Sequence, residues 1–334
     1  MESPPHEILA RLWLCSLLAM EGGACRAAAL PHDSPEFWDA AQRIAVGHGL
    51  APLLARHASR GLWPKENQKE LDRARSYTLA ANLVQLDAGN ELLGSLENAG
   101  IPVAPIKGLA LLRAGIYEPG ERPMTDIDLL VRAADIERAR DLVLESGWEV
   151  VDCSRAARLR HHHWVFLLPG QPAVGLDLHW TPATGERVMP DWDALGVTEG
   201  SDPSLSVQLF FLAANTARHG FTGKLLFLHD LARILHVRHD EIDWGFLEVL
   251  ATQTRSRRAV TLALACAAEA FGPRVPARSG FEPSAYDRRI LKSLWPLSSW
   301  ESRWGGRALR LATADSPAGT LRTGGKGLLN LLRR

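Results

Sequence analysis

The spacing of hydrophobic residues predicts helices over the first hundred residues. Between about residues 65 and 98, leucines recur at the three- and four-residue intervals of an amphipathic helix: Leu79, Leu83, Leu86, Leu93 and Leu96. Gly100 predicts the end of this helix. Ser34 followed by Pro35 predicts a second helix start, because serine caps helices and proline suits the first helical position. We therefore expect an N-terminal helical region over residues 1–100.

The hydrophobic pattern changes after residue 100. "IPVAPIKG" (101–108) is a short apolar run closed by glycine, which predicts a buried strand, and "LALLRAGIY" (109–117) predicts a helix after it. "DIDLLV" (126–131) predicts the next strand, and the amphipathic stretch 132–147 predicts a helix. Three more strands are expected at "WEVVDC", "HHWVFLLP" and "AVGLDLHW". Strands that alternate with helices, followed by three consecutive strands, predict an α+β core with a small mixed sheet over residues 101–182.

The chain becomes helical again beyond the predicted core. Amphipathic helices are expected over 204–220 and 223–239, and one or two helices over 243–272. We expect residues 183–315 to form a C-terminal helical region. The glycine-rich and basic stretch 316–334 is expected to be a flexible tail.

Two aspartates introduce the first candidate chemistry. Asp126 and Asp128 lie two residues apart in "ERPMTDIDLLV", so in a strand both side chains project from one face. Neighbouring carboxylates repel unless a cation lies between them, and Mg²⁺ is the cation that prefers oxygen ligands. The alternative interpretation is structural, with Asp126 at the strand entry and Asp128 in a salt bridge. Both interpretations remain open on this motif alone.

Neighbouring residues favour the functional interpretation. Lys107 and Gly108 lie between a predicted strand and a predicted helix, where a glycine, a lysine ammonium group and free backbone N–H groups can approach phosphate. Arg122 is a further candidate phosphate contact, although a solvated loop arginine would also explain it. Asp177 alternates with apolar residues and shares a strand face with His179. If that strand pairs with 126–131, three carboxylates converge, as two-metal phosphoryl transfer requires; Glu149 and Asp152 are alternative third carboxylates.

Composition narrows the classes of function. The chain has 38 Lys plus Arg and 38 Asp plus Glu, and this balance argues against long duplex nucleic acid as a partner. The four cysteines are scattered, so neither a zinc site nor a disulfide framework is expected. The apolar N-terminus lacks the basic start of a signal peptide, and no uninterrupted apolar run is long enough to span a membrane. A cytoplasmic location without membrane contact is therefore expected.

Together these motifs resemble a known superfamily. The order of the motifs is similar to that in the polymerase-β-like nucleotidyltransferases: K-G, a helix, R-P-M-x-D-I-D-L-L-V, a helix and a strand with D-L-H-W. More narrowly, the chain resembles a bacterial family of uncharacterised nucleotidyltransferases, including its helical segments at 48–57 and 217–235. The resemblance extends from about residue 30 to 275. It departs at the turn, which is Lys-Gly here instead of Gly-Ser or Gly-Gly, and in a longer gap between Gly108 and Asp126.

The resemblance implies a polymerase-β-like core and a specific reaction. An NMP group would pass from an NTP, with ATP expected, to an acceptor, and pyrophosphate would leave. Asp126, Asp128 and Asp177 would be catalytic and would bind Mg²⁺ or Mn²⁺. Lys107, Gly108 and Arg122 would bind the nucleotide. The acceptor stays open between a protein, a small molecule and an RNA end.

Other residues and other functions also fit parts of the sequence. His161 and His163 of "RHHHW" can share a strand face and hold a transition metal, or lie on a solvated edge strand. The possible substrate-cleft residues are His179, His219, Lys224 and Asp230. A D-x-D glycosyltransferase with Mn²⁺ would explain the aspartates but neither Lys107 nor Asp177. A degenerate protein that binds a nucleotide or a partner without chemistry is the third hypothesis.

Overall fold

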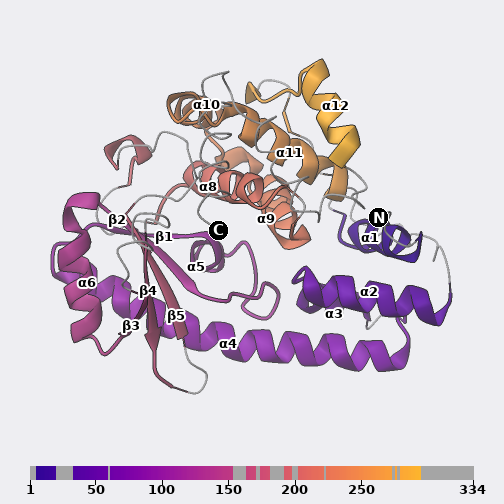
Figure 1. The fold of residues 1–334 in the computed structure, drawn as a ribbon, viewed down its shortest axis with the longest axis horizontal. Coiled ribbons are helices and arrows are strands. Elements are labelled where there is room, and N and C mark those ends of the chain that lie inside the picture. The colour runs from indigo at the N-terminus through magenta and orange to yellow at the C-terminus, as the bar shows by residue number, and fades with distance from the viewer. Residues whose placement is uncertain are drawn as a thin grey trace, which may run out of the picture. The chain divides into compact units, whose positions relative to one another are not determined.

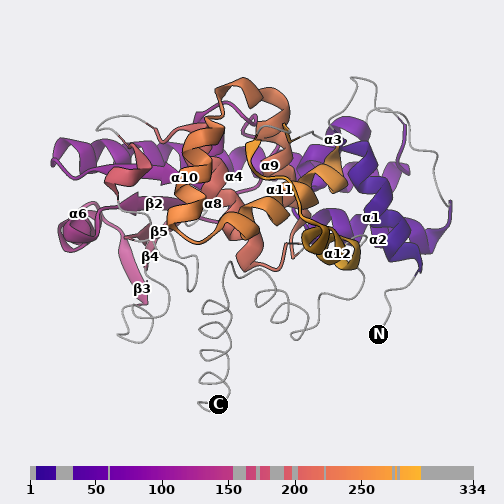
Figure 2. The ribbon, with the colours of Figure 1, turned by 90° about the horizontal axis from the view of Figure 1, so that it is seen from above.

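The computed structural model of the protein is drawn in Figures 1 and 2. It describes residues 5–19, 33–58, 61–152, 163–170, 174–180, 192–197, 202–221, 223–272, 275–276 and 279–294. The chain divides into two compact units. One comprises Arg73–Ala183 and Met189–Phe211; the other comprises Met1–Asp72, Thr184–Val188 and Leu212–Arg334. The predicted boundaries at residues 100, 182 and 315 stay a prediction, and the predicted tail lies outside the described residues.

The first unit contains a five-stranded mixed sheet. Its strands are β1 (Val103–Ile106), β2 (Ile127–Val131), β3 (Glu149–Asp152), β4 (His163–Leu168) and β5 (Val174–His179). Their order is β1-β2-β5-β4-β3, and only β2 and β5 run parallel among these neighbours. The five predicted strands are therefore confirmed, and so is the α+β class with a small mixed sheet.

Helices cover the apolar face of this sheet. Ile127 and Leu129 point to that face of β2, and both are fully buried. The unit contains α5 (Lys107–Arg113), the short helix η1 (Ala133–Asp135), α6 (Ile136–Glu145), η2 (Asp193–Leu195) and the start of α8 (Leu205–Arg218). Helix α4 (Lys65–Asn98) packs closely on the apolar face, because a Cβ atom at Gly89 would lie 3.5 Å from Cδ1 of Ile127. Helix α6 lies beside the sheet (Figure 1), where the Arg140 guanidinium stacks over Trp164 of β4.

The buried side of α4 is polar over part of its length. The predicted helix is confirmed at Lys65–Asn98, and Leu93 and Leu96 are buried as its pattern suggests. Leu79 and Leu83 are exposed, however, at 43% and 52% of their surface. The side chains buried there are instead polar: Thr78, Asn82 and Gln85. The leucine pattern therefore predicted the helix but not the face that it buries in this half.

The second unit is helical in its described residues. It contains α1 (Pro5–Leu17), α2 (Pro35–Gly47), α3 (Ala51–Ala58), α9 (Leu225–Val237), η3 (His239–Glu241), α10 (Trp244–Gln253), α11 (Arg257–Phe271) and α12 (Ala285–Leu294). Stretch 243–272 therefore forms two helices. The Ser34 side chain accepts a hydrogen bond from the Phe37 amide at 3.3 Å, which confirms the predicted cap of α2.

Long-range contacts join the segments of this helical unit. Trp13 of α1 packs against Phe37, Trp38 and Trp63, with ring centroids 5.2–5.6 Å apart. The backbone amide of Leu225, at the start of α9, donates to Nδ1 of His48 at 3.1 Å. His48 thereby satisfies one of the N–H groups that a helix start leaves without a partner within the helix. This bond joins residues 48–57 and 217–235, the two segments on which the resemblance relied.

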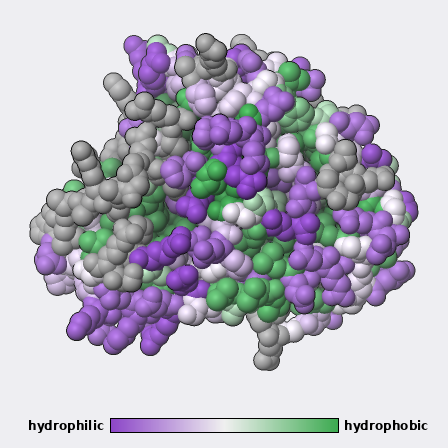
Figure 3. Space-filling view, turned by 180° about the vertical axis from the view of Figure 1, so that it is seen from behind, coloured by the Kyte–Doolittle hydropathy of each residue, from purple (hydrophilic) through white to green (hydrophobic). Residues whose placement is uncertain are grey.

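Figure 3 shows hydrophilic and hydrophobic side chains intermingled on one face. None of the described helices is both long and apolar enough to cross a bilayer.

Candidate active site

Three aspartates lie on the polar face of the sheet, opposite the face that α4 covers. Asp128 of β2 is the register partner of Asp177 on the parallel strand β5. Asp126 precedes β2 by one residue, two positions before Asp128, and therefore shares its side of the strand. Asp126 lies beside Gly175 of β5, since a Cβ atom at Gly175 would be in ordinary contact with Cβ of Asp126, at 3.6 Å. The predicted convergence of the three carboxylates depends on pairing between β2 and β5, and the structure has this pairing.

Asp128 is buried and held by two nitrogen donors. Only 5% of the residue is exposed. Nζ of Lys107 lies 2.5 Å from its Oδ1 atom, and Nε2 of His179 lies 2.9 Å from the same oxygen. Burial by itself raises the pKa of Asp128, but the charge of Lys107 and the hydrogen bond from His179 outweigh burial and hold that pKa well below its ordinary value. Asp128 is therefore a carboxylate at neutral pH, and both nitrogens donate to it.

Asp126 experiences the opposite electrostatic environment. Burial and the neighbouring charge of Asp128 raise the pKa of Asp126 above its ordinary value, although Lys107 and a hydrogen bond from Thr125 oppose the rise. A second negative charge on this face is therefore disfavoured without additional positive charge. A divalent cation between the two side chains would supply that charge, so the donor set fits a metal such as Mg²⁺.

Lys107 begins helix α5 in a strained backbone conformation. Its φ angle is 55°, in the left-handed region that glycine adopts readily and other residues adopt at a cost of about 1–2 kcal/mol. The Lys107 amide donates to Oε1 of Gln208 at 3.3 Å, and Nε2 of Gln208 donates to the Pro105 carbonyl at 2.9 Å. Gln208, which is 1% exposed, thus holds both sides of the turn. The sequence predicts free backbone N–H groups at the start of this helix for binding phosphate, but the first of them, that of Lys107, already donates to Gln208.

Gly108 allows a loop to pack directly onto this turn. A Cβ atom at Gly108 would lie 2.7 Å from Nη1 of Arg122 and 2.8 Å from Cγ of Met124. Both distances are too short for a Cβ atom to fit unless the side chains of Arg122 and Met124 shift. Arg122 is only 5% exposed, so it is not a solvated loop arginine. The missing side chain of Gly108 therefore allows the close approach of the Arg122 and Met124 side chains.

Polar side chains of α4 hold the same loop from beneath. Nδ2 of Asn82 donates to the Pro119 carbonyl at 2.6 Å and to the Arg122 carbonyl at 2.7 Å, and its Oδ1 atom accepts from the Met124 amide at 3.3 Å. Nε2 of Gln85 donates to the Met124 carbonyl at 3.2 Å. The sequence interpretation missed both residues. The local sequence indicates them in one way: Thr78, Asn82 and Gln85 are spaced four and three residues apart, which places these polar residues on one face of the helix.

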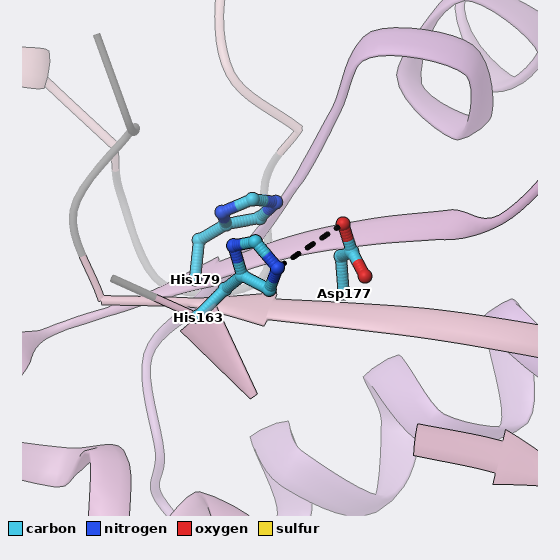
Figure 4. A group of neighbouring side chains, drawn as sticks. All are labelled: His163, Asp177 and His179. Atoms are coloured by element: carbon cyan, nitrogen blue, oxygen red, sulfur yellow. Dashed lines mark ion pairs between the residues drawn. The ribbon is translucent and has the colours of Figure 1, made fainter. Parts of the chain in front are cut away.

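Two histidines adjoin Asp177 (Figure 4). His163 of β4 is the register partner of His179 on β5, and their ring centroids are 5.0 Å apart. Nε2 of His163 lies 3.8 Å from Oδ2 of Asp177. Sequence reasoning placed His163 on a strand with His161, but His161 lies outside the described residues. The pairing of β4 with β5 places His163 beside His179 and Asp177.

The remaining candidates lie elsewhere. Glu149 and Asp152 belong to β3, which two intervening strands separate from β2, so Asp177 is the third carboxylate that lies beside Asp128. The candidates His219, Lys224 and Asp230 belong to the helical unit. His219 and Lys224 are exposed, and both lie near Phe227: the His219 ring is 5.2 Å and the Lys224 Nζ atom 5.9 Å from the centre of the Phe227 ring. Asp230 is completely buried.

Comparison with known proteins identifies the family. Residues 34–272 match the model of a family described as uncharacterised nucleotidyltransferase. The chain belongs to this family. No curated protein and no solved structure matches the chain. The predicted family is therefore confirmed, and the protein is a nucleotidyltransferase, an enzyme that transfers NMP groups.

Membership of the nucleotidyltransferase family agrees with the chemistry of the polar face. Nucleotidyltransferases generally act on nucleoside triphosphates and use divalent metals. The face offers carboxylate oxygens for such a cation and the Lys107 ammonium group for phosphate. These donor types are the ones that bind a metal–nucleotide complex.

Proposed function

We propose that this nucleotidyltransferase transfers NMP from an NTP to an acceptor hydroxyl in a Mg²⁺-dependent reaction that releases pyrophosphate. The observation that carries the proposal is the parallel register of Asp128 with Asp177, with Asp126 beside Gly175 on the same face. Asp126 and Asp128 would hold Mg²⁺ or Mn²⁺, and Asp177 would share one ion. A bound ion of this kind neutralises phosphate charge and steadies the departing pyrophosphate.

The bond changes follow from the reaction class. The acceptor oxygen forms a bond to the α-phosphorus, and the bond from that phosphorus to the bridging oxygen of the β-phosphate breaks. The electron pair of the broken bond leaves on pyrophosphate. The acceptor proton passes to Asp177, whose two carboxylate oxygens allow one to bind an ion while the other accepts a proton.

Lys107 has two roles in this proposal. In the absence of a nucleotide its ammonium group pairs with Asp128 and partly neutralises that buried charge. Asp128 would be neutralised instead by a cation that it holds together with Asp126, and the Lys107 ammonium group would then be available to bind the β- and γ-phosphates. Gly108 and Arg122 lie beside Lys107 and are the other proposed nucleotide contacts.

ATP is the proposed donor, and the acceptor is a protein, a small molecule or an RNA end. The matched charge of the chain, 38 acidic and 38 basic side chains, makes long duplex nucleic acid the least suitable acceptor. His179, which lies beside Asp128, is a further proposed substrate contact.

The proposal is tested with α-labelled NTPs. Each NTP is incubated with Mg²⁺ or Mn²⁺ in a lysate that supplies acceptors, with the wild type and with Asp128→Ala and Asp126→Asn. Label transferred by the wild type and lost in both variants is the expected result. Asp141→Asn is the matched control, because Asp141 lies exposed on α6. Near-normal transfer by Asp128→Ala would overturn the assignment, and nucleotide binding without transfer would instead support the degenerate binder.

A further inference from the structure

The polar face carries a group of metal-binding side chains that differs in chemistry from the aspartate pair. One ring nitrogen each from His163 and His179 and one carboxylate oxygen of Asp177 all lie within 4.8 Å of one another. Figure 4 shows the three side chains gathered on one side of β4 and β5. Two nitrogens and one oxygen form a donor set typical of first-row transition metals, whereas Mg²⁺ prefers oxygen ligands alone.

Strand geometry brings these three residues together without help from a loop. Asp177 and His179 are two positions apart on β5 and project from the same face. His163 is directly opposite His179 across the antiparallel β4–β5 pair. Because the group lies on paired strands, the backbone fixes the spacing of its side chains, as a preformed metal site requires.

The distance between His163 and Asp177 is within the range expected for two ligands of one ion. Nε2 of His163 and Oδ2 of Asp177 are 3.8 Å apart, which is too long for a hydrogen bond. Two ligands that each bind one ion at about 2.1 Å lie about 3–4.2 Å apart, depending on the angle between them. Two of the side chains are partly accessible, with 13% of the His163 and 20% of the Asp177 side-chain surface exposed, so an ion can reach them from that side. The His179 side chain is buried, with 4% of its surface exposed.

We propose that His163, Asp177 and His179 bind a divalent transition-metal ion, such as Zn²⁺ or Mn²⁺, beside the Mg²⁺ site of Asp126 and Asp128. His179 connects the two sites, since its Nε2 atom contacts Asp128 while its ring lies in the histidine group. The proposal rests on the proposed function in one respect: both assign Asp177 to metal binding. Its test uses metal alone, so it can fail while nucleotidyl transfer is still observed.

The test is metal binding by the full chain after removal of metals with a chelator. Zn²⁺ and Mn²⁺ are titrated by calorimetry, and Co²⁺ is added as a visible spectroscopic probe of nitrogen ligation. The wild type is expected to bind one equivalent of Zn²⁺ and to retain it in excess Mg²⁺. Replacing a residue that only orients a metal ligand weakens metal binding about 10–100-fold. His163 is itself a proposed ligand, so His163→Ala is expected to weaken Zn²⁺ binding by at least about a hundredfold.

Two controls separate this site from other metal ligands. Asp126→Asn alters the aspartate pair and should leave Zn²⁺ binding and the Co²⁺ spectrum intact. The double variant His161→Ala/His162→Ala removes the neighbouring histidines of "RHHHW" and should also retain the ion. The proposal is wrong if the wild type binds no transition metal, if His163→Ala binds as tightly as the wild type, or if the double variant loses the ion. Thermal unfolding in chelator, with His163→Gln as a second variant, establishes that the altered chains are folded.

Discussion

Lys107 and Asp128 form an ion pair across the junction of β1 and β2, with Nζ and Oδ1 2.5 Å apart. The register of the strands accounts for it, because Ile106, the residue before Lys107, is the partner of Asp128. The pair joins the residue proposed to bind phosphate to a residue proposed to bind metal. Nucleotide and metal would therefore compete with a contact already present within the protein.

The strained backbone of Lys107 can be measured separately from its charge. Lys107→Gly and Lys107→Ala both remove the ammonium group, but only glycine relieves the left-handed conformation at φ 55°. We expect Lys107→Gly to be more stable than Lys107→Ala by about 1 kcal/mol, measured by urea unfolding. Both variants should transfer NMP more slowly than the wild type. Equal stabilities would show that the backbone of residue 107 relaxes without cost.

Gly108→Ala is expected to impair activity through the loop that packs on it. The new methyl group would meet the side chains of Arg122 and Met124 at less than 3 Å and displace them. We expect a large fall in kcat/KM for the NTP and a lower Tm. Gly94→Ala is the matched control, because a Cβ atom there meets nothing within 4 Å and Gly94 lies within α4. The control should gain about 0.5–1 kcal/mol of stability and keep its activity.

Asn82→Ala is expected to destabilise the first unit. Asn82 is completely buried and makes three hydrogen bonds to the backbone of residues 119–124. Backbone groups left buried without a partner cost about 1–3 kcal/mol each, so the loss should be at least about 2 kcal/mol in urea unfolding. Asn98→Ala, at the exposed end of the same helix, should change stability by less than about 0.5 kcal/mol. A small effect at Asn82 would mean that water replaces its side chain.

Local patterns predicted the elements of this fold but not the contacts between distant segments. Alternation in "DIDLLV" and "AVGLDLHW" was sufficient for both strands and for the face that carries Asp126, Asp128 and Asp177. It could not supply the strand order that puts β4 beside β5 and so brings His163 to Asp177. Strand register is a long-range property, and period-two alternation does not specify the partner strand.

The polar residues beneath the site were missed for a different reason. Asn82 and Gln208 are buried polar side chains whose partners are backbone groups 37 or more residues away. Hydrophobic periodicity treats such residues as solvent-facing, so it assigned the wrong buried face to the first half of α4. Buried polar residues require partners, and only the tertiary structure shows where those partners are.

The two described cysteines should resist alkylation in the native protein. Burial raises the pKa of both the Cys15 thiol and the Cys266 thiol to about 12. The thiolate is the reactive form, so at pH 8 only about one molecule in ten thousand has it at either site, before access is considered. An unfolded cysteine has a pKa of about 8.5, and both residues should therefore react readily in guanidinium.

Site-resolved mass spectrometry after iodoacetamide treatment at pH 8 measures this difference. Labelling of Cys15 and Cys266 is expected to be slow in the native protein and complete after unfolding. Because a raised pKa favours the neutral thiol, burial of these residues stabilises the fold below about pH 8.5 and progressively less above it. Rapid native labelling of Cys15 would show that α1 opens from the aromatic group around Trp13. Rapid labelling of Cys266 alone would place such opening at α11.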